Sequence, residues 1–280
     1  MASEPDRYAV IGHPIAHSRS PWIHARFAAQ TGQRLVYTAI DASPAMLATC
    51  VHEFFARGGR GLNVTVPHKE SVLPLLSNLS ERARVAGAVN FIMREHDHGL
   101  RGDNTDGVGL VRDLTHNLGV TVAGRHVLLL GAGGAARGIL APLLELKPVE
   151  LVIVNRSPAR AVALARQFGA HGAVRGTDFA ALAGERFELI INATAAGLSQ
   201  EVPPLPPGVL AADSVCYDLS YARGTTRFVQ WAREHGVTRS FAGAGMLVEQ
   251  AAESFLLWRG IRPQTAGVLA ELIAQTAEPA

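Results

Sequence analysis

Short runs of apolar residues alternate with longer segments of helical periodicity along almost the whole chain. This alternation is typical of βα units on a parallel sheet. It predicts strands at residues 8–12, 35–40, 61–66, 125–130, 151–154, 189–192 and 214–218. It also predicts helices that begin at Pro21 and after Pro67, and that span 44–57, 107–117, 158–168, 246–259 and 265–275. Another helix follows a glycine cluster as far as Lys147, and a short antiparallel pair is expected around His96-Asp97-His98-Gly99.

The pattern of strands and helices changes at residue 107, where a second series of alternating helices and strands begins. This change indicates two α/β units. We expect one unit at residues 1–106, a nucleotide-type unit at 107–241 and C-terminal helices at 242–280. No internal repeat or low-complexity tract is visible. Periodicity alone does not assign the C-terminal helices to either unit.

Composition narrows the class of protein. The 280 residues are 48% hydrophobic and 18% charged, which is enough to bury a large core. Twenty-six basic against 24 acidic residues leave a net charge of +2, which argues against a strongly basic nucleic-acid binder. No apolar run reaches the roughly 18 residues of a membrane helix, and the first ten residues lack the layout of a signal peptide. Two distant cysteines argue against a disulfide framework. These features predict a soluble, cytoplasmic globular protein.

The clearest motif is VLLLGAGGAARG at residues 127–138. Gly131, Gly133 and Ala136 follow an apolar strand and open a helix, which is the context of a dinucleotide site. Gly131 permits the tight turn, Gly133 lets the backbone approach a pyrophosphate, and Ala136 allows close helix–strand packing. The free N–H groups at the start of the helix attract the phosphates. We therefore predict that residues 107–241 bind a nucleotide.

The residues after the next strand select the cofactor. An NAD site usually carries an acidic residue there, which accepts a hydrogen bond from the ribose 2′-hydroxyl. This chain has Asn155-Arg156-Ser157, with Arg160 one helical step further. Two guanidinium groups and a hydroxyl suit a 2′-phosphate, so the sequence predicts NADP rather than NAD. In the alternative interpretation Arg156 faces water and binds nothing.

The N-terminal unit lacks a glycine-rich phosphate loop, so it should bind something other than a nucleotide. In HSRSPW, Pro21 suits the first turn of a helix and Ser20 suits its N-cap. Ser18 and Ser20, together with free helical N–H groups, could hold a carboxylate. The alternative is that Ser20 only caps its helix.

A second segment of this unit, NVTVPHK, contains one of the few lysines of the chain. Only Lys69 and Lys147 are lysines among the 26 basic residues. Lysine can lose its proton near neutral pH and arginine cannot, so Lys69 is a candidate for chemistry. In NVTVPHK, Asn63 and Thr65 share one strand face, and Lys69 is expected in the first turn of the following helix.

Several other polar residues have plainer interpretations. In GDNTDG, Asp103 and Asp106 lie before the nucleotide unit and suit a turn or an N-cap. The eleven histidines show no convincing ligand spacing, so no metal site is predicted. Cys50 lies in an amphipathic segment and is expected to be a small core residue.

Taken together, these motifs resemble the shikimate dehydrogenase family along essentially the whole chain. The matching stretches, in order, are GHPIAHSRSP, NVTVPHK, AGAVN, GDNTDGVG, GAGGAARG, NRS, NAT, YDLSY and GMLVEQA. The resemblance implies an N-terminal α/β substrate-binding domain completed by C-terminal helices, plus a Rossmann-type NADP-binding domain. It also implies reversible reduction of 3-dehydroshikimate to shikimate by NADPH, in the biosynthesis of chorismate and aromatic amino acids.

The resemblance also implies roles for individual residues. Lys69 and Asp106 would be the catalytic pair, and Ser18 and Ser20 would hold the substrate carboxylate. The residues implied to contact the substrate ring are Thr65, Asn90, Asp106, Tyr221 and Gln250, with Asn63 and Lys69 beside them. Those implied to contact the cofactor are Gly131, Ala132, Gly133, Gly134, Ala135, Asn155, Arg156, Ser157, Arg160, Thr194, Leu219, Gly243 and Met246. The chain departs from the family pattern at Ala195-Ala196 and in AGAG before Met246.

Two rival functions remain open. A quinate/shikimate dehydrogenase would share the motifs and accept a substrate with one more hydroxyl group. A non-catalytic NADP-sensing module would keep the glycine turn and Arg156 but would not need the pair of Lys69 and Asp106. The partner is expected to be a small molecule, with neither nucleic acid nor membrane, and a homodimer is favoured over a monomer.

Overall fold

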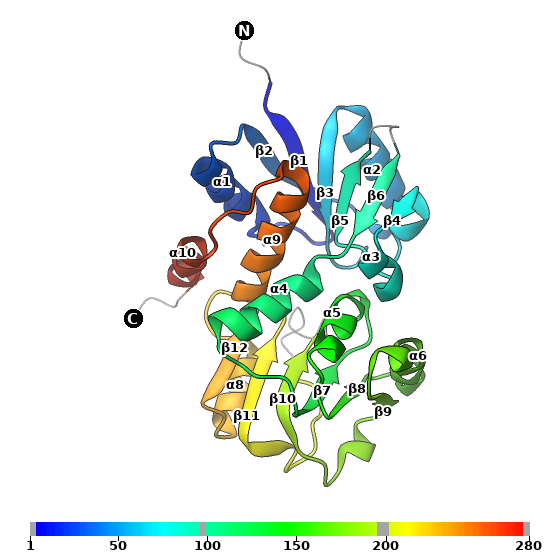
Figure 1. Cartoon of the computed structure of the whole chain (residues 1–280), viewed down its shortest axis with the longest axis vertical. Helices are drawn as coiled ribbons and strands as arrows, with labels where there is room; N and C mark the ends of the chain where they lie inside the picture. Colours follow the sequence, from blue (N-terminus) through cyan, green and yellow to red (C-terminus); the bar gives the residue numbers. More distant parts are fainter. Residues whose placement is uncertain (1–3, 96–98, 195–201, 277–280) are drawn as a thin grey trace.

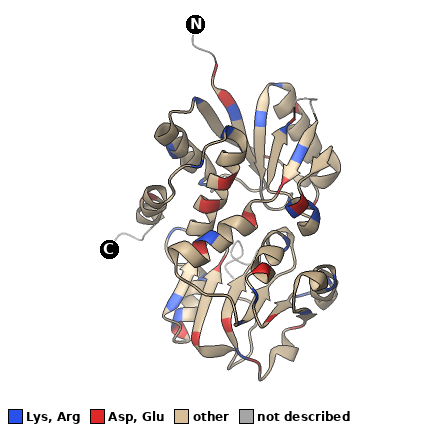
Figure 2. Ribbon diagram, viewed as in Figure 1, with Lys and Arg blue, Asp and Glu red and all other residues tan. Residues whose placement is uncertain are grey.

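The computed structural model describes residues 4–95, 99–194 and 202–276, and it contains two six-stranded sheets (Figure 1). The first sheet occupies the upper half of Figure 1 and the second sheet the lower half, with α4 and α9 between them. Positions of charged residues of both signs are interspersed along the ribbon of both halves (Figure 2). None of the described helices is long and apolar enough to cross a membrane.

The first sheet is mixed and has the strand order β2-β1-β3-β5-β6-β4. Strands β1, β2 and β3 are parallel, whereas β5 runs antiparallel to β3 and β6. Its strands are β1 (Asp6–Gly12), β2 (Leu35–Asp41), β3 (Gly59–Val64), β4 (Asn78–Leu79), β5 (Phe91–Arg94) and β6 (Leu100–Asp103). Its helices are α1 (Ser20–Thr31), α2 (Leu47–Ala56) and α3 (Glu81–Ala86), with the single 3₁₀ turns η1 (Pro44–Met46) and η2 (Leu73–Leu75).

The second sheet is entirely parallel and has the order β12-β11-β10-β7-β8-β9. This is the Rossmann order, in which the chain reverses direction across the sheet between β7 and β10. Its strands are β7 (His126–Leu130), β8 (Glu150–Val154), β9 (Val174–Thr177), β10 (Phe187–Asn192), β11 (Leu210–Asp218) and β12 (Arg239–Ala242). Around it lie α4 (Asp106–Arg112), the π turn η3 (Asp113–Asn117), α5 (Gly134–Glu145), α6 (Pro158–Phe168), η4 (Gly169–His171), η5 (Ala180–Leu182) and α8 (Arg227–Glu234).

The C-terminal helices α9 (Ala244–Arg259) and α10 (Ala266–Thr276) return to the first sheet. Phe255 of α9 and Leu272 of α10 share one apolar cluster with Ile23 and Phe27 of α1. Trp258 of α9 stacks on Phe91 of β5, with ring centroids 4.9 Å apart. Burial of these aromatic rings attaches α9 to a sheet formed by residues more than 150 positions earlier in the chain.

The predicted fold class is confirmed: the protein is α/β, with a Rossmann-type sheet and a second sheet completed by C-terminal helices. The predicted strands and most predicted helices are present, and β5 pairs with β6 in antiparallel fashion. Residues 96–98 of the predicted turn between them lie outside the described residues. The residue boundaries of the domains stay predictions.

The prediction of a helix after Pro67 is wrong. The segment from Val66 to Val72 forms turns, and only the short η2 follows. Two features oppose a helix here. Pro74 has no N–H to donate to the Glu70 carbonyl, which accepts from the Leu73 N–H instead. The Lys69 carbonyl accepts a tertiary hydrogen bond from the Val89 N–H at 2.7 Å.

The periodicity also missed several elements, namely α3, α8, β4, β9 and β12. The missed strands are short, and β4, β9 and β12 lie at sheet edges, where apolar patterning is weak. The two helices did carry a signal, because Ser80 caps α3 and Thr226 caps α8 through their side chains.

Candidate active site

Lys69 and Asp106 form an ion pair at the junction of the two sheets, with Lys69 Nζ 2.5 Å from Asp106 Oδ2. Lys69 lies in the turns after β3, and Asp106 is the first residue of α4. Their side chains are only 12% and 5% exposed. Burial of an ion pair costs desolvation free energy unless other polar groups surround it. The neighbours of this pair are polar.

Asn90 orients the carboxylate of Asp106. Its amide nitrogen donates to Asp106 Oδ1 at 2.8 Å, to Thr105 Oγ1 at 2.9 Å and to Gln250 Oε1 at 3.3 Å. Its amide oxygen accepts from the Thr105 N–H at 2.8 Å. Each oxygen of Asp106 therefore has its own donor, Lys69 on one side and Asn90 on the other. Gln250 joins the same cluster from α9.

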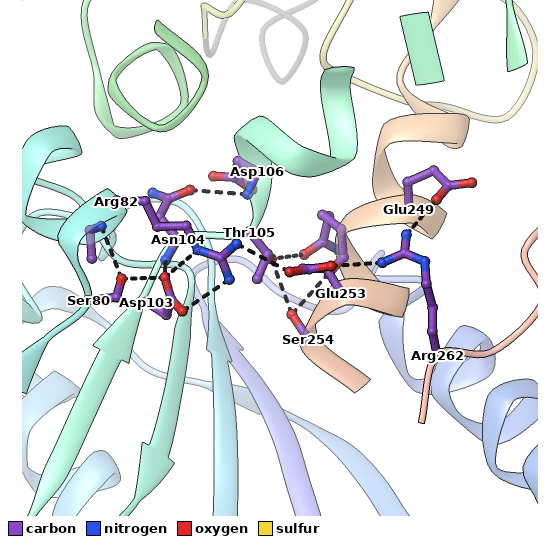
Figure 3. A network of polar contacts seen from close by, with 12 residues as sticks. Ser80, Arg82, Asp103, Asn104, Thr105, Asp106, Glu249, Glu253, Ser254 and Arg262 are labelled. Atoms are coloured by element: carbon purple, nitrogen blue, oxygen red, sulfur yellow. Dashed lines mark hydrogen bonds and ion pairs between the residues drawn. The ribbon is translucent and has the colours of Figure 1, made fainter. Parts of the chain in front are cut away.

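Asn63 links this cluster to β2 and α9. It accepts a hydrogen bond from the Tyr37 hydroxyl at 2.7 Å and donates to Ser254 Oγ at 3.0 Å. The Oγ atom of Ser254 in turn lies 3.2 Å from Thr105 Oγ1, within hydrogen-bond distance (Figure 3). Sequence reasoning missed Tyr37, Thr105 and Ser254. Thr105 stands inside the GDNTDG motif, whereas nothing local in the sequence distinguishes Tyr37 or Ser254.

Ser18, Ser20 and Tyr221 meet at the start of α1. The Ser20 N–H donates to Ser18 Oγ at 3.3 Å, and the Arg19 N–H donates to the Tyr221 hydroxyl at 3.4 Å. The predicted N-cap is wrong, because the cap residue is Arg19 and no side chain caps the helix. Ser20 is instead the first helical residue and is buried. Burial raises the pKa of Tyr221, so its hydroxyl stays protonated at neutral pH.

Thr65 is held by its backbone at the end of β3. Its N–H donates to the Ile11 carbonyl at 3.0 Å, and its carbonyl accepts from the His68 N–H at 2.9 Å. A Cβ atom on Gly12 would lie 2.5 Å from the Thr65 methyl group, so Gly12 makes this position possible. Thr65 thus lies where the parallel strands β1 and β3 end, the usual place for a ligand site in such sheets.

The glycine turn follows β7 as predicted. Gly131 has a φ of +106°, and a Cβ atom there would lie 3.0 Å from the Ala193 carbonyl oxygen. Gly133 precedes α5 without a side-chain cap, and a Cβ atom on it would contact nothing within 4 Å. The start of α5 therefore presents uncapped N–H groups beside open space. This geometry fits a phosphate group.

The predicted phosphate-binding arginines differ in their contacts. Arg156 is exposed and makes no hydrogen bond or ion pair with another described residue. Arg160 is exposed too, but its guanidinium donates to the Ala132 carbonyl at 3.4 Å and lies 3.9 Å from Glu70. Asn155 donates to the Ser157 carbonyl at 3.1 Å, and this bond shapes the turn into α6. The guanidinium groups of Arg156 and Arg160 both fit a 2′-phosphate. To bind it, Arg160 would give up its long contacts with Ala132 and Glu70.

The remaining predicted cofactor residues gather at the ends of β10, β11 and β12. Thr194 donates to Asn192 Oδ1 from both its N–H and its hydroxyl, at 3.2 and 2.7 Å. The Leu219 N–H donates to the Asn192 carbonyl, and a Cβ atom on Gly243 would lie 2.4 Å from the Leu219 carbonyl oxygen. The Met246 N–H donates to the Tyr217 hydroxyl at 3.3 Å. Ala195 and Ala196 lie outside the described residues.

Helix α5 brings the predicted cofactor residues next to the ion pair of Lys69 and Asp106. A Cβ atom on Gly134 would lie 2.8 Å from Lys69 Cβ, and one on Gly138 would lie 3.1 Å from Asp106 Oδ2. Glycines one helical turn apart therefore let the helix of the glycine turn pack directly on the ion pair. Among the described residues no group of three or more His, Cys, Asp or Glu side chains could hold a metal ion.

A network of charges lies behind the site (Figure 3). Arg82 binds both carboxylate oxygens of Asp103 at 2.6 and 3.0 Å and reaches Glu253 of α9 at 3.2 Å. Arg112 and Arg262 both bind Glu249, each at 2.9 Å. Arg82 connects Asp103, which precedes Asp106, to α9, and Arg112 connects α4 to the same helix, which carries Gln250 and Ser254.

Comparison with known proteins matches three segments of the chain to one family. Residues 10–92 match the model of the shikimate dehydrogenase substrate binding domain, 113–199 that of shikimate / quinate 5-dehydrogenase, and 243–273 that of the shikimate 5′-dehydrogenase C-terminal domain. The chain is 58% identical to a shikimate dehydrogenase (NADP(+)) of Methylococcus capsulatus over 273 residues, 98% of either chain. It is 54% identical to one of Thioalkalivibrio sulfidiphilus, over 94% of this chain and 97% of that one.

Solved structures show the same likeness. The Thermus thermophilus shikimate 5-dehydrogenase in complex with NADP(H) and shikimate is 35% identical with a TM-score of 0.84, over 97% of this chain and 99% of that one. The crystal structure of an Ael1 enzyme from Pseudomonas putida is 45% identical with a TM-score of 0.86, over 98% of this chain and 99% of that one.

Proposed function

The chain belongs to the shikimate dehydrogenase family, and we propose that it carries out its reaction at the ion pair of Lys69 and Asp106. It is an NADP-dependent oxidoreductase that acts on a CH–OH group and interconverts shikimate and 3-dehydroshikimate. The observation that carries the assignment to these two residues is their 2.5 Å contact, nearly buried between the two sheets.

NADPH, when bound, supplies the hydride that reduces the ketone carbon. The uncapped start of α5 at Gly133 and Gly134 suits its pyrophosphate, and Arg156 and Arg160 suit its 2′-phosphate. Gly131, Ala132 and Ala135 form the rest of this turn. Asn155, Ser157, Thr194, Leu219, Gly243 and Met246 complete the proposed set.

Lys69 stabilises the negative charge that develops on the ketone oxygen during reduction. Asp106 orients the ammonium group, and Asn90 in turn holds Asp106 through its other oxygen. The pair also supplies the proton that the oxygen takes up on reduction, and in the reverse direction it receives the hydroxyl proton of shikimate.

The substrate carboxylate is assigned to Ser18 and Ser20, whose hydroxyl groups stand at the start of α1. Tyr221, a neutral hydroxyl donor in contact with Arg19, stands beside them. Asn63, Thr65, Asn90 and Gln250 present amide and hydroxyl groups to the ring hydroxyls. Asn63, Asn90 and Gln250 are buried, and each hydrogen-bonds to a side chain from another element. These three groups are therefore preorganised for a polyhydroxylated ring.

Reduction of NADP⁺ with shikimate and with quinate, side by side, tests both the substrate and the catalytic pair. We expect turnover of shikimate and a roughly 10²-fold or larger loss of kcat in Asp106→Asn, because the ammonium group loses its orienting charge. Cofactor affinity, measured by titration, should stay near the wild-type value. Near-normal kcat in Asp106→Asn would contradict the assignment, and comparable turnover of quinate would move the protein to the rival quinate/shikimate class.

A homodimer and a cytoplasmic location are also expected. Sedimentation of the purified protein would test the first. Neither bears on the chemistry of the site.

A further inference from the structure

Glu70, the residue after Lys69, faces two arginines that belong to helices of the second sheet. Its carboxylate lies 3.3 Å from Arg137 Nε of α5 and 3.9 Å from Arg160 Nη2 of α6. The proposed reaction does not use Glu70, yet Arg160 is one of the two residues proposed to bind the 2′-phosphate. A protein carboxylate and a cofactor phosphate therefore have one guanidinium group in common.

Glu70 is also close to the proposed pyrophosphate site. A Cβ atom on Gly134, the first residue of α5, would lie 3.7 Å from Glu70 Cγ. The uncapped N–H groups of this first turn attract anions, and a carboxylate nearby repels a second anion. Both contacts therefore place the negative charge of Glu70 where it opposes a phosphorylated ligand.

The two arginines are held to different degrees. Arg137 is 22% exposed and donates to Gln167 Oε1 at 2.7 Å, and the Gln167 amide donates to the Val85 carbonyl of α3 at 2.9 Å. The Arg160 side chain is 59% exposed, and among the described residues its guanidinium has only the long contacts to Glu70 and Ala132. Arg160 can therefore turn toward a phosphate, while Arg137 still neutralises Glu70.

We propose that Glu70 is a specificity-determining residue for the cofactor, which lowers affinity for NADPH more than for NADH by competing with the 2′-phosphate for Arg160. This inference rests on the proposed role of Arg160. NADH has the pyrophosphate but no 2′-phosphate, so it experiences only the repulsion at the start of α5. NADPH experiences that repulsion and must also draw Arg160 away from Glu70.

Titration of NADPH and NADH, followed by fluorescence, into the wild-type protein and Glu70→Gln tests the proposal. Glutamine keeps the size of the side chain and removes its charge. We expect the Kd for NADPH to fall about two- to fivefold, the range of partly exposed ion pairs, and the Kd for NADH to fall less. The matched control is Glu81→Gln, which removes a 77%-exposed carboxylate of α3 whose ion pair is local, with Arg84. This control should leave both affinities unchanged.

Arg160→Gln, alone and combined with Glu70→Gln, separates the inference from the proposed function. Arg160→Gln should weaken NADPH binding, and in its presence Glu70→Gln should no longer improve NADPH over NADH. If Arg160→Gln weakens NADPH but Glu70→Gln leaves its Kd unchanged, or improves NADPH and NADH equally, the inference fails and Arg160 keeps its role. If Arg160→Gln leaves the Kd for NADPH unchanged, the proposed phosphate site itself is wrong.

Discussion

On the side of the first sheet, the candidate site consists of buried side chains that hydrogen-bond to one another, whereas on the side of the second sheet it consists of backbone, glycines and exposed arginines. Asn63, Asn90 and Asp106 are each at most 6% exposed, and each has a partner from a distant segment. Gly131 and Gly133 act through turn geometry and open space, and Arg156 faces outward.

This difference follows from the ligands that the two sides are proposed to bind. A small polyhydroxylated ring needs several polar groups at fixed positions, and only packing and mutual hydrogen bonds fix side chains so closely. A phosphate carries enough charge to be bound by helix N–H groups and mobile guanidinium groups. We therefore expect substitutions on the side of the first sheet to lower kcat strongly. Substitutions on the side of the second sheet should change the affinity for the cofactor by smaller amounts.

The largest expected effect is on the catalytic pair. Lys69→Arg and Lys69→Ala should each lower kcat by roughly 10²- to 10⁴-fold while NADP⁺ binding stays largely intact. Arginine should fail because its planar guanidinium is bulkier than an ammonium group and donates a proton poorly. The confined position of Lys69, 12% exposed and packed against Gly134, leaves little room for it.

Steady-state kinetics beside a cofactor titration would measure this effect. A chain with 24 arginines and two lysines has placed lysine at this position. If the arginine variant turned over at nearly the wild-type rate, Lys69 would contribute only a positive charge to binding. The expected difference between the side of the first sheet and the side of the second sheet would then lose its main evidence.

Arg156→Asp tests the graded behaviour of the second side. The carboxylate would repel the 2′-phosphate, so NADPH binding should weaken by about 1.5–3 kcal/mol, the value of a hydrogen bond to a charged group. NADH binding should stay similar or improve. The comparison of kcat/KM for the two cofactors measures the change, and an unaltered preference for NADP would place the phosphate site elsewhere.

A third prediction concerns pH, because His24 is fully buried on the first side and stacks on Tyr37 with ring centroids 4.1 Å apart. Burial lowers the pKa of His24 from 6.5 to about 3. Below about pH 6.5 the unfolded chain therefore binds a proton at His24 that the folded chain excludes, so stability falls as the pH falls toward 3. Between pH 7 and pH 5 the loss from this residue should be about 2 kcal/mol.

The free energy of unfolding, measured by urea titration at pH 7 and pH 5, would show this loss, and His24→Phe should reduce it. Buried carboxyl groups of the second side have the opposite sign, since burial raises the pKa of Asp113 and of Asp218. An equal acid sensitivity in His24→Phe and the wild-type protein would assign the effect to other groups.

The smallest expected effect is at the start of α1. Ser18→Ala or Ser20→Ala removes one of the hydroxyl donors to the carboxylate and leaves the other, so we expect the lower end of the value of a hydrogen bond to a charged group, about 1.5 kcal/mol. KM for shikimate should then rise roughly tenfold. KM for NADP⁺ should change less. The structure strengthens this expectation for Ser20, because its side chain does not cap the helix. Equal rises in both constants would indicate a structural role for these serines.

Local patterns in the sequence determined most of the secondary structure, the glycine turn and the Rossmann-type unit. Strand and helix periods are properties of neighbouring residues, and Gly131 is needed for a turn that spans only a few positions. The resemblance of nine short motifs extended this to the family and the reaction, which the comparisons bear out. The roles of the individual residues stay predictions.

Tertiary structure alone decided how the motifs combine. In place of the helix expected after Pro67, the Lys69 carbonyl accepts a hydrogen bond from the Val89 N–H, a contact that no local pattern encodes. Lys69 meets Asp106 across 37 positions, and Asn63 meets Ser254 across 191. Such pairs depend on where whole elements pack, and packing is set by the sum of many weak contacts between buried faces rather than by any single residue. For the same reason the position of Glu70 beside Arg137 and Arg160 depends on how α5 and α6 lie relative to the turns after β3.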